Sequence, residues 1–125
     1  MEIFELYITT HFSSAHLLKG HPGECARLHG HNWLIEVFVR CHELNEIGIG
    51  IDFKDIKQEV KEVLQTLDHQ NLSELPAFEH INPTCENIAK YLYVELSRRI
   101  NTSSVQVSKI KISETPTAGA SYWQE

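Results

Sequence analysis

The residues that could do chemistry are concentrated between positions 25 and 31. This stretch, Cys-Ala-Arg-Leu-His-Gly-His, holds a thiol, a cation and two imidazoles within seven residues. His29 and His31 are two positions apart, so in extended backbone their side chains leave the same face of a strand. Two such imidazoles can bind one metal ion, and a third would make a catalytic zinc site with an open fourth position. His16, which ends the run Phe-Ser-Ser-Ala-His, is the best candidate for the third ligand.

Cys25 lies four residues before His29, and two interpretations of it fit the sequence equally well. As a fourth metal ligand, its thiolate would close the site and make it structural. As a free thiol beside the cation of Arg27, it would be more acidic than an ordinary cysteine and could act as a general base. The first interpretation describes a non-catalytic module with a structural zinc ion, and the second describes an enzyme.

Carboxylates at two other places are further candidates. Asp68 and His69 are adjacent at the end of a predicted helix, where they form either a terminal charge pair or an acid/base pair whose carboxylate orients the ring. Glu114 ends a predicted strand with an apolar inner face. It is either a solvent-facing acid or an acceptor for two adjacent N–H donors, such as the 2-amino-4-oxo edge of a pterin or guanine.

The composition predicts one globular domain, residues 1–125. Of the 125 residues, 42% are apolar and 22% are charged, and this length leaves no room for a second core. The net charge is −6 and there is no block of Lys or Arg, so electrostatics give no support for binding to nucleic acid or to a membrane surface. Lys19 and Arg27 either line a local pocket for an anionic ligand or are solvated surface charges.

The sequence carries no sign of secretion or of a membrane anchor. Residues 1–5 contain acid where a secretory signal would be basic, and no apolar run approaches the ~20 residues that span a bilayer. The cysteines at positions 25, 41 and 85 are odd in number and lack the spacing of a disulfide framework. We therefore expect a reduced, cytoplasmic protein. Cys41 and Cys85 are interpreted as small packing residues.

Two predicted strands flank the stretch that contains Cys25. Residues 2–12 alternate in the manner of a strand, and residues 17–28, with two glycines and a proline, predict a loop. Residues 31–42 form a second strand with apolar side chains on both faces, which indicates partial burial of both, for example against another chain. We expect the two strands to pair antiparallel, with the loop over one end.

Two helices and two further strands follow. Asp52 is the predicted N-cap of a helix that ends near residue 69, and Thr84 is the N-cap of a second helix that ends near Ile100. The next strand breaks its two-residue apolar phase between positions 107 and 110, which predicts a β-bulge. After a turn at 115–120 comes a last short strand.

The order is therefore β-β-α-α-β-β, an α+β domain with two helices on one face of a small antiparallel sheet. Four strands leave two open edges, and oligomerisation is one way to cover them.

Six segments together resemble the 6-pyruvoyl-tetrahydropterin synthase / 6-carboxytetrahydropterin synthase family. They span nearly the whole chain in the family's order, and the set is far more specific than any one of them. The stretch 25–31 and the Glu-Thr-x-Thr-Ala-Gly motif are most similar to the bacterial 6-carboxytetrahydropterin synthases of queuosine synthesis. The matching segments are residues 12–16, 25–32, 52–53, 67–69, 82–87 and 113–120.

The resemblance implies the tunnelling fold, or T-fold. Subunits of that fold join their sheets into a barrel, usually as trimers stacked into hexamers, with active sites between subunits. The resemblance also implies that zinc is bound by His16, His29 and His31.

The catalytic roles are implied in the same way. Cys25 would be the base, Asp68 and His69 would complete a relay with it, and Glu114 would bind the pterin ring. Arg27 is a further candidate for substrate binding.

The implied activity is that of a zinc-dependent lyase. Its substrate would be 7,8-dihydroneopterin triphosphate, and its products would be 6-carboxy-5,6,7,8-tetrahydropterin, acetaldehyde and triphosphate. The alternative within the family is 6-pyruvoyl-tetrahydropterin synthase activity, which stops after triphosphate loss and rearrangement and would use the same residues. The alternative of another class is the non-catalytic module with structural zinc.

Overall fold

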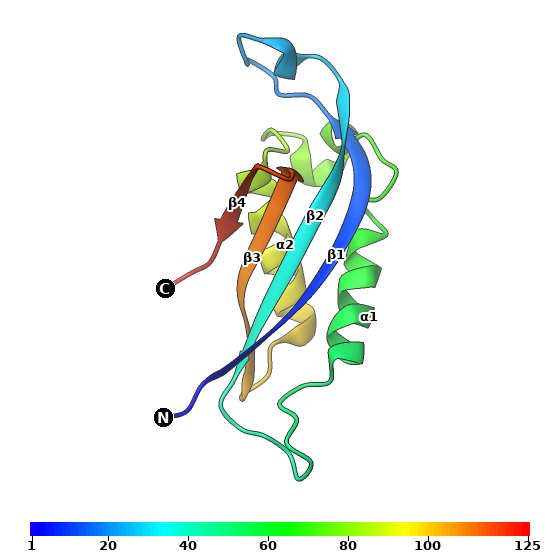
Figure 1. Ribbon diagram of the computed structural model, residues 1–125. Helices are drawn as coiled ribbons and strands as arrows, with labels where there is room; N and C mark the ends of the chain where they lie inside the picture. Colours follow the sequence, from blue (N-terminus) through cyan, green and yellow to red (C-terminus); the bar gives the residue numbers. More distant parts are fainter.

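A four-stranded antiparallel sheet with two helices on one face forms the framework of the protein (Figure 1). The computed structural model describes all 125 residues. The elements, in chain order, are β1 (Phe4–His16), η1 (Glu24–Ala26), β2 (His29–Cys41), α1 (Phe53–Leu64), η2 (Leu72–Glu74), η3 (Pro76–Phe78), α2 (Cys85–Ile100), β3 (Val105–Thr115) and β4 (Ala118–Tyr122). This arrangement confirms the predicted α+β class and the β-β-α-α-β-β order.

Strands β1 and β2 form a long hairpin whose far end carries the histidines. The pairing runs without interruption from Phe4 opposite Cys41 to His16 opposite His29. The predicted end of the first strand at Phe12 and the predicted start of the second at His31 are both wrong. The ladder continues because the run pairs with β2 on one side and its outward backbone groups bond to Asp68, His69 and Gln70 on the other. These bonds outweigh the weak strand propensity of the Ser-Ser-Ala run.

The other two pairings define the rest of the sheet. The register between β2 and β3 shifts at Phe38/Val39, which leaves Ser108 as the extra residue of a bulge. The predicted bulge between positions 107 and 110 is therefore confirmed, and Val107 and Ile110 are both buried. The turn between β3 and β4 is shorter than predicted, since Ala118 already pairs with Thr115. A side chain at Gly119 would collide with the backbone of β3, so glycine is required there.

The core lies between the sheet and the helices. Asp52 and Thr84 cap α1 and α2 as predicted, each accepting a hydrogen bond from a backbone N–H of the first turn. Helix α1 ends at Leu64, not near residue 69, and a run of turns carries the chain from there back to β1. One face of β2 is fully buried against the helices through Trp33, Ile35, Val37 and Val39.

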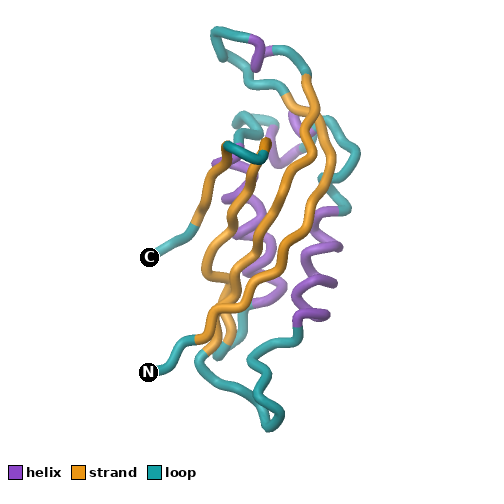
Figure 2. Tube along the Cα trace, in the orientation of Figure 1, coloured by secondary structure: helices purple, strands orange, loops and turns teal.

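Both helices cover the same face of the sheet, and the opposite face is open (Figures 1 and 2). On that open face Leu34 is 41% exposed, and the ring of Phe38 lies 5.7 Å from that of Tyr7 and 4.3 Å from the Lys109 ammonium. The outer edges of β1 and β4 pair with no other strand of the chain. Neither helix has the length and apolar content of a membrane span.

Candidate metal centre and active site

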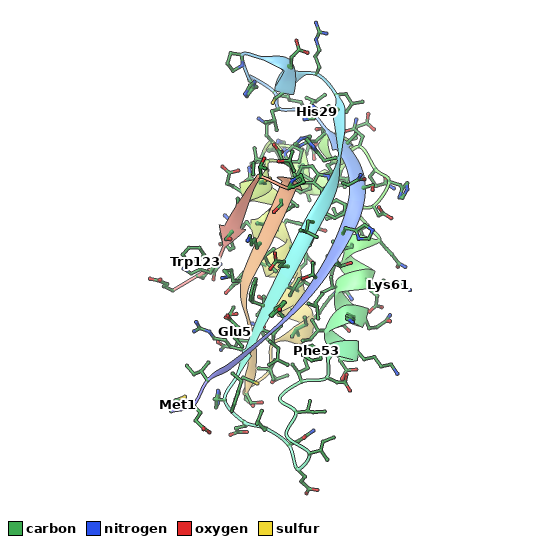
Figure 3. All side chains as sticks on the ribbon, viewed as in Figure 1. Met1, Glu5, His29, Phe53, Lys61 and Trp123 are labelled. Carbon is green, nitrogen blue, oxygen red and sulfur yellow. The ribbon has the colours of Figure 1, made fainter.

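The three predicted metal ligands meet at one end of the β1–β2 hairpin. His16 is the last residue of β1, and its strand partner His29 and the next histidine, His31, are at the start of β2. One ligand nitrogen from each ring lies within 4.8 Å of the other two. Figure 3 shows His29 near one end of the molecule, far from Glu5 and Phe53. The register of the hairpin, which pairs His16 with His29, therefore brings the three histidines together.

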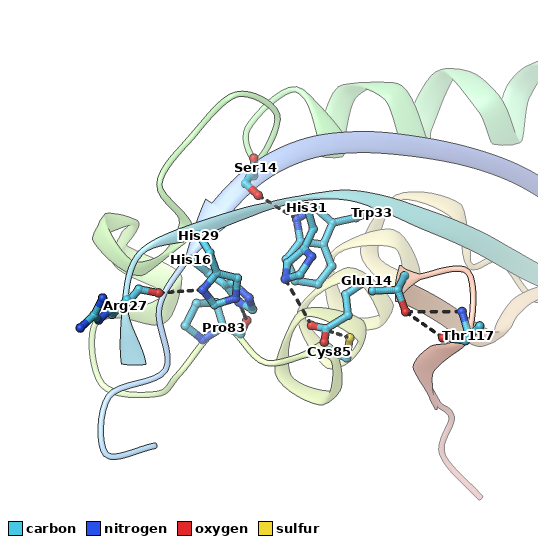
Figure 4. A network of polar contacts seen from close by, with 11 residues as sticks. Ser14, His16, Arg27, His29, His31, Trp33, Pro83, Cys85, Glu114 and Thr117 are labelled. Atoms are coloured by element: carbon cyan, nitrogen blue, oxygen red, sulfur yellow. Dashed lines mark hydrogen bonds and ion pairs between the residues drawn. The ribbon is translucent and has the colours of Figure 1, made fainter. Parts of the chain in front are cut away.

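Hydrogen bonds to two backbone carbonyls fix the orientation of two of these rings (Figure 4). His16 Nδ1 lies 2.7 Å from the Pro83 oxygen, and His29 Nδ1 lies 2.7 Å from the Arg27 oxygen. A carbonyl oxygen only accepts, so each Nδ1 carries the hydrogen and each Nε2 keeps a free lone pair. This support of a ligating ring through its other nitrogen is typical of metal sites.

The unpaired nitrogen atoms of the histidine cluster indicate whether its residues fit a metal ion. The Nε2 atoms of His16 and His31 are buried and have no hydrogen-bond partner, although buried polar atoms are rarely left unpaired. Burial lowers the pKa of His16 and of His31, and neighbouring imidazoles lower both further, against opposing effects of the Pro83 carbonyl on His16 and of Glu114 on both. Both rings are therefore neutral at pH 7, which is the form that binds metal. Three imidazole ligands are the set that holds a zinc ion with an open fourth position.

Glu114 lies directly beside this cluster, near the end of β3. Its Oε2 atom is 3.7 Å from His31 Nε2, and its side chain is 35% exposed. Cys85, the first residue of α2, places its thiol 3.9 Å from the same oxygen. Burial, and then the charge of Glu114, raise the pKa of Cys85 to about 11, so the thiol stays protonated and can donate to the carboxylate.

Cys85 was interpreted from the sequence as a packing residue only, and its contact with Glu114 was not predicted. The two residues are 29 positions apart. The one signal in the sequence was the place of Cys85 in the segment 82–87.

Asp68 and His69 form a second group, held against β1. Asp68 Oδ1 accepts from the Ser13 backbone N–H at 2.9 Å, and Asp68 Oδ2 lies 2.9 Å from His69 Nδ1. The Ser13 N–H contributes most to lowering the pKa of Asp68, and His69 lowers it further. The His69 backbone has a φ of +57°, a strained conformation that its N–H bond to Ser13 O helps to hold. The carboxylate therefore orients a ring that is 80% exposed.

The side chains of Cys25 and Arg27 form no hydrogen bond or ion pair with either group in the same chain. Cys25 is half-buried in η1, and no hydrogen bond or ion pair joins its thiol to Asp68 or His69. The thiol is also absent from the group of metal-ligand atoms formed by the three histidines. The Arg27 guanidinium is exposed and pairs with Glu24 at 3.8 Å, so only its backbone oxygen supports the site.

The sheet, the two helices and the histidine cluster define a T-fold subunit with a candidate three-histidine metal site. Residues 5–125 match the family described as 6-pyruvoyl tetrahydropterin synthase, and the chain belongs to this family of pterin synthases.

Curated relatives and a solved structure extend this match. The chain is 37% identical over 103 residues to a putative 6-carboxy-5,6,7,8-tetrahydropterin synthase of Archaeoglobus fulgidus, covering 82% of this chain and 84% of the relative. It is 31% identical over 134 aligned positions to the 6-carboxy-5,6,7,8-tetrahydropterin synthase of Haemophilus influenzae, covering 89% and 92%. The structure of Caenorhabditis elegans 6-pyruvoyl tetrahydropterin synthase superposes with a TM-score of 0.88 at 29% identity, covering 100% and 98%.

Proposed function

We propose that the protein is a zinc-dependent 6-carboxy-5,6,7,8-tetrahydropterin synthase. It would convert 7,8-dihydroneopterin triphosphate and one molecule of water to 6-carboxy-5,6,7,8-tetrahydropterin, acetaldehyde and triphosphate in the cytoplasm, as a lyase of queuosine synthesis. The observation that carries the proposal is the position of Glu114, 3.7 Å from His31 in the histidine cluster. A pterin anchored on that carboxylate would have its side chain next to the metal position.

The metal ligands, Glu114 and Cys85 would each have a different role in the site. Zinc held by the three histidines would polarise the side-chain oxygens of the substrate and acidify the neighbouring C–H bonds. The two oxygens of Glu114 match two adjacent N–H donors of the pterin ring. The protonated thiol of Cys85 is directed at the Oε2 atom of Glu114 and would help to hold the carboxylate in place.

The proton transfers fall to Cys25 and His69. Cys25 would act as general base, and His69, oriented by the ionised Asp68, would move the second proton. Loss of these protons allows triphosphate to leave by elimination, and carbon–carbon cleavage can follow. Arg27, with its exposed guanidinium, would contact the anionic substrate.

We further propose that this site is completed between subunits of a trimer or hexamer. Within one chain no bond joins Cys25 to Asp68 or His69. The outer edge of β4, and that of β1 as far as Phe12, are free to pair with other copies, which would join the sheets into a barrel.

The test is incubation with 7,8-dihydroneopterin triphosphate, followed by mass analysis of the products and an assay for acetaldehyde. We expect acetaldehyde and the 6-carboxy product. Triphosphate release without acetaldehyde would instead support 6-pyruvoyl-tetrahydropterin synthase activity. That alternative is favoured by the 32% identity over 97 residues to the Dictyostelium discoideum 6-pyruvoyl tetrahydrobiopterin synthase, covering 68% of this chain and 72% of the relative. No turnover by zinc-loaded protein would support the non-catalytic module.

A further inference from the structure

The loop that carries Cys25, residues 17–28, runs directly from one metal ligand to the next. It leaves β1 after His16 and enters β2 at His29, and Figure 1 shows it extending beyond the end of the sheet. Most of its residues are exposed. A residue that acts as a general base must nevertheless be held in place, so the bonds that hold this loop matter for Cys25.

Two side chains outside the loop hold it, and each binds both backbone polar groups of one loop residue. The Ser73 hydroxyl accepts from the Leu17 N–H at 3.0 Å and donates to the Leu17 oxygen at 3.2 Å. The Asn82 amide accepts from the Lys19 N–H at 3.0 Å and donates to the Lys19 oxygen at 2.9 Å. These bonds, together with the one from the His29 ring to the Arg27 oxygen, are the hydrogen bonds that join the loop to the rest of the chain.

The residue between these two attachment points holds Cys25. The Leu18 N–H donates to the Cys25 oxygen at 2.7 Å. Leu17 and Lys19, on either side of Leu18, are the residues held from outside. Gly20 then turns the chain with a φ of +86°, which glycine adopts without strain. The position of Cys25 is thus tied to Ser73 and Asn82 through a single backbone bond.

Asn82 is itself anchored at the start of α2. Its backbone oxygen accepts from the Asn87 side chain and from the Thr84 N–H, both at 2.9 Å. The next residue, Pro83, supplies the carbonyl that holds the ring of His16. The same short segment therefore supports a metal ligand and, through the side chain of Asn82, the loop of the proposed base.

We propose that Ser73 and Asn82 are positioning residues that hold the Cys25 loop in its catalytic place. The catalytic role of Cys25 comes from the proposed function, and this part of the inference rests on it. The attachment of the loop by Ser73 and Asn82 does not depend on that role. It assigns no contact with substrate to either residue. Loss of either side chain should free the segment around Lys19 and misplace Cys25.

The first test is limited trypsin digestion, which reports on the loop without reference to activity. The Asn82→Ala and Ser73→Ala variants should be cleaved after Lys19 about tenfold faster than wild type, because cleavage needs local opening of the backbone. Cleavage after Lys57, in α1, should not change. Ser73→Thr keeps the hydroxyl and should restore the wild-type rate.

Asn45→Ala is the matched control. The Asn45 side chain also holds a loop by two hydrogen bonds, from the N–H groups of Ile47 and Ile49, at the opposite end of the molecule. This variant should leave cleavage after Lys19 unchanged. Equal acceleration in Asn45→Ala, or no acceleration in Asn82→Ala and Ser73→Ala, would overturn the proposal.

The second test is a comparison of kcat and KM in the same variants. A misplaced base should lower kcat by roughly ten- to a hundredfold with little change in KM, because Glu114 is untouched. Ser73 does not flank Pro83, so Ser73→Ala tests the loop without disturbing the support of His16. Faster cleavage with an unchanged kcat would overturn the positioning role. If wild type turns over no pterin, the proposed function fails, while the cleavage rates still support or overturn the holding of the loop.

Discussion

At the scale of single residues, Glu114 links the two parts of the proposed chemistry. Its carboxylate lies 3.7 Å from His31 of the histidine cluster and would bind the pterin ring. Its neighbour Cys85 is kept protonated by burial and by the charge of Glu114 itself. A carboxylate beside a thiol donor and a neutral imidazole keeps its second oxygen free. That geometry suits an acceptor for a ligand better than a structural ion pair.

Replacement of Glu114 by Gln should weaken pterin binding without loss of zinc. The amide offers one acceptor where two donors need partners, and an unpaired buried donor costs about 1–3 kcal/mol, so KM should rise about fivefold to a hundredfold. Steady-state kinetics and metal analysis provide the measurement. Glu95→Gln is the control, because Glu95 is also a half-buried carboxylate but pairs with Arg98 on α2, outside the site. An unchanged KM and kcat in Glu114→Gln would remove the residue from the site.

Asp68 gives a prediction about pH. Its pKa is lowered in the folded protein by the Ser13 N–H and by His69, so its ionised form stabilises the fold above the ordinary carboxyl pKa of about 4. This stabilisation disappears as the pH falls through the lowered pKa. Asp68→Asn should therefore have a lower Tm than wild type at pH 7, and the difference should shrink below about pH 4. A Tm difference that stays constant from pH 7 to pH 3 would contradict this account.

The elements of the fold bring these residues together, and the α2 N-terminus does most to support them. Thr84 caps the helix, and the carbonyl of Pro83 just before it orients His16. The cap therefore stabilises both a helix and the ring of a proposed metal ligand. The cap of α1, Asp52, lies at the opposite end of the sheet and supports no site residue.

Thr84→Ala and Asp52→Ala should separate these two effects. Each variant should lose about 1 kcal/mol of folding stability, the usual contribution of an N-cap. Only Thr84→Ala should also weaken zinc binding, by up to about tenfold, because the partner of a ligating ring is displaced. Denaturation curves and competition with a chelator measure the two quantities. Equal zinc affinity in both variants would show that the cap does not support His16.

The sequence was sufficient to predict the order of the elements and the clustering of the three histidines, largely because both follow local rules. The two-residue spacing of His29 and His31 and the caps at Asp52 and Thr84 are local signals, and the structure has them where they were predicted. The strand ends were missed, since β1 continues to His16 only through pairing with β2. The contacts of Glu114 with Cys85 and of Asn82 with Lys19 join residues 29 and 63 positions apart, so no local pattern predicts them.

The whole molecule presents an uncovered sheet face and two outer strand edges, which other copies of the chain would cover in the proposed oligomer. Cys25 and the Asp68–His69 pair, which one chain does not bring into contact, would then meet across a subunit boundary. Such a site makes complementation between two inactive variants possible.

Cys25→Ala and His69→Ala should each be inactive alone and active when unfolded, mixed in equal amounts and refolded together. In a cyclic ring assembled at random, about one site in four combines an intact Cys25 with an intact His69. Activity should therefore return to roughly a quarter of wild type by the same counting. If both residues served one site from one chain, every site in the mixture would carry a lesion, and well-folded mixed oligomers would remain inactive.

The central claim, that the three histidines hold a catalytic zinc ion, is tested most directly by the zinc content of His29→Ala. Wild type should carry about one zinc ion per chain, and so should the control His42→Ala, which removes an exposed histidine beyond the other end of β2. His29→Ala should carry almost none and should lose turnover. A folded His29→Ala protein with full zinc content and activity would contradict the account.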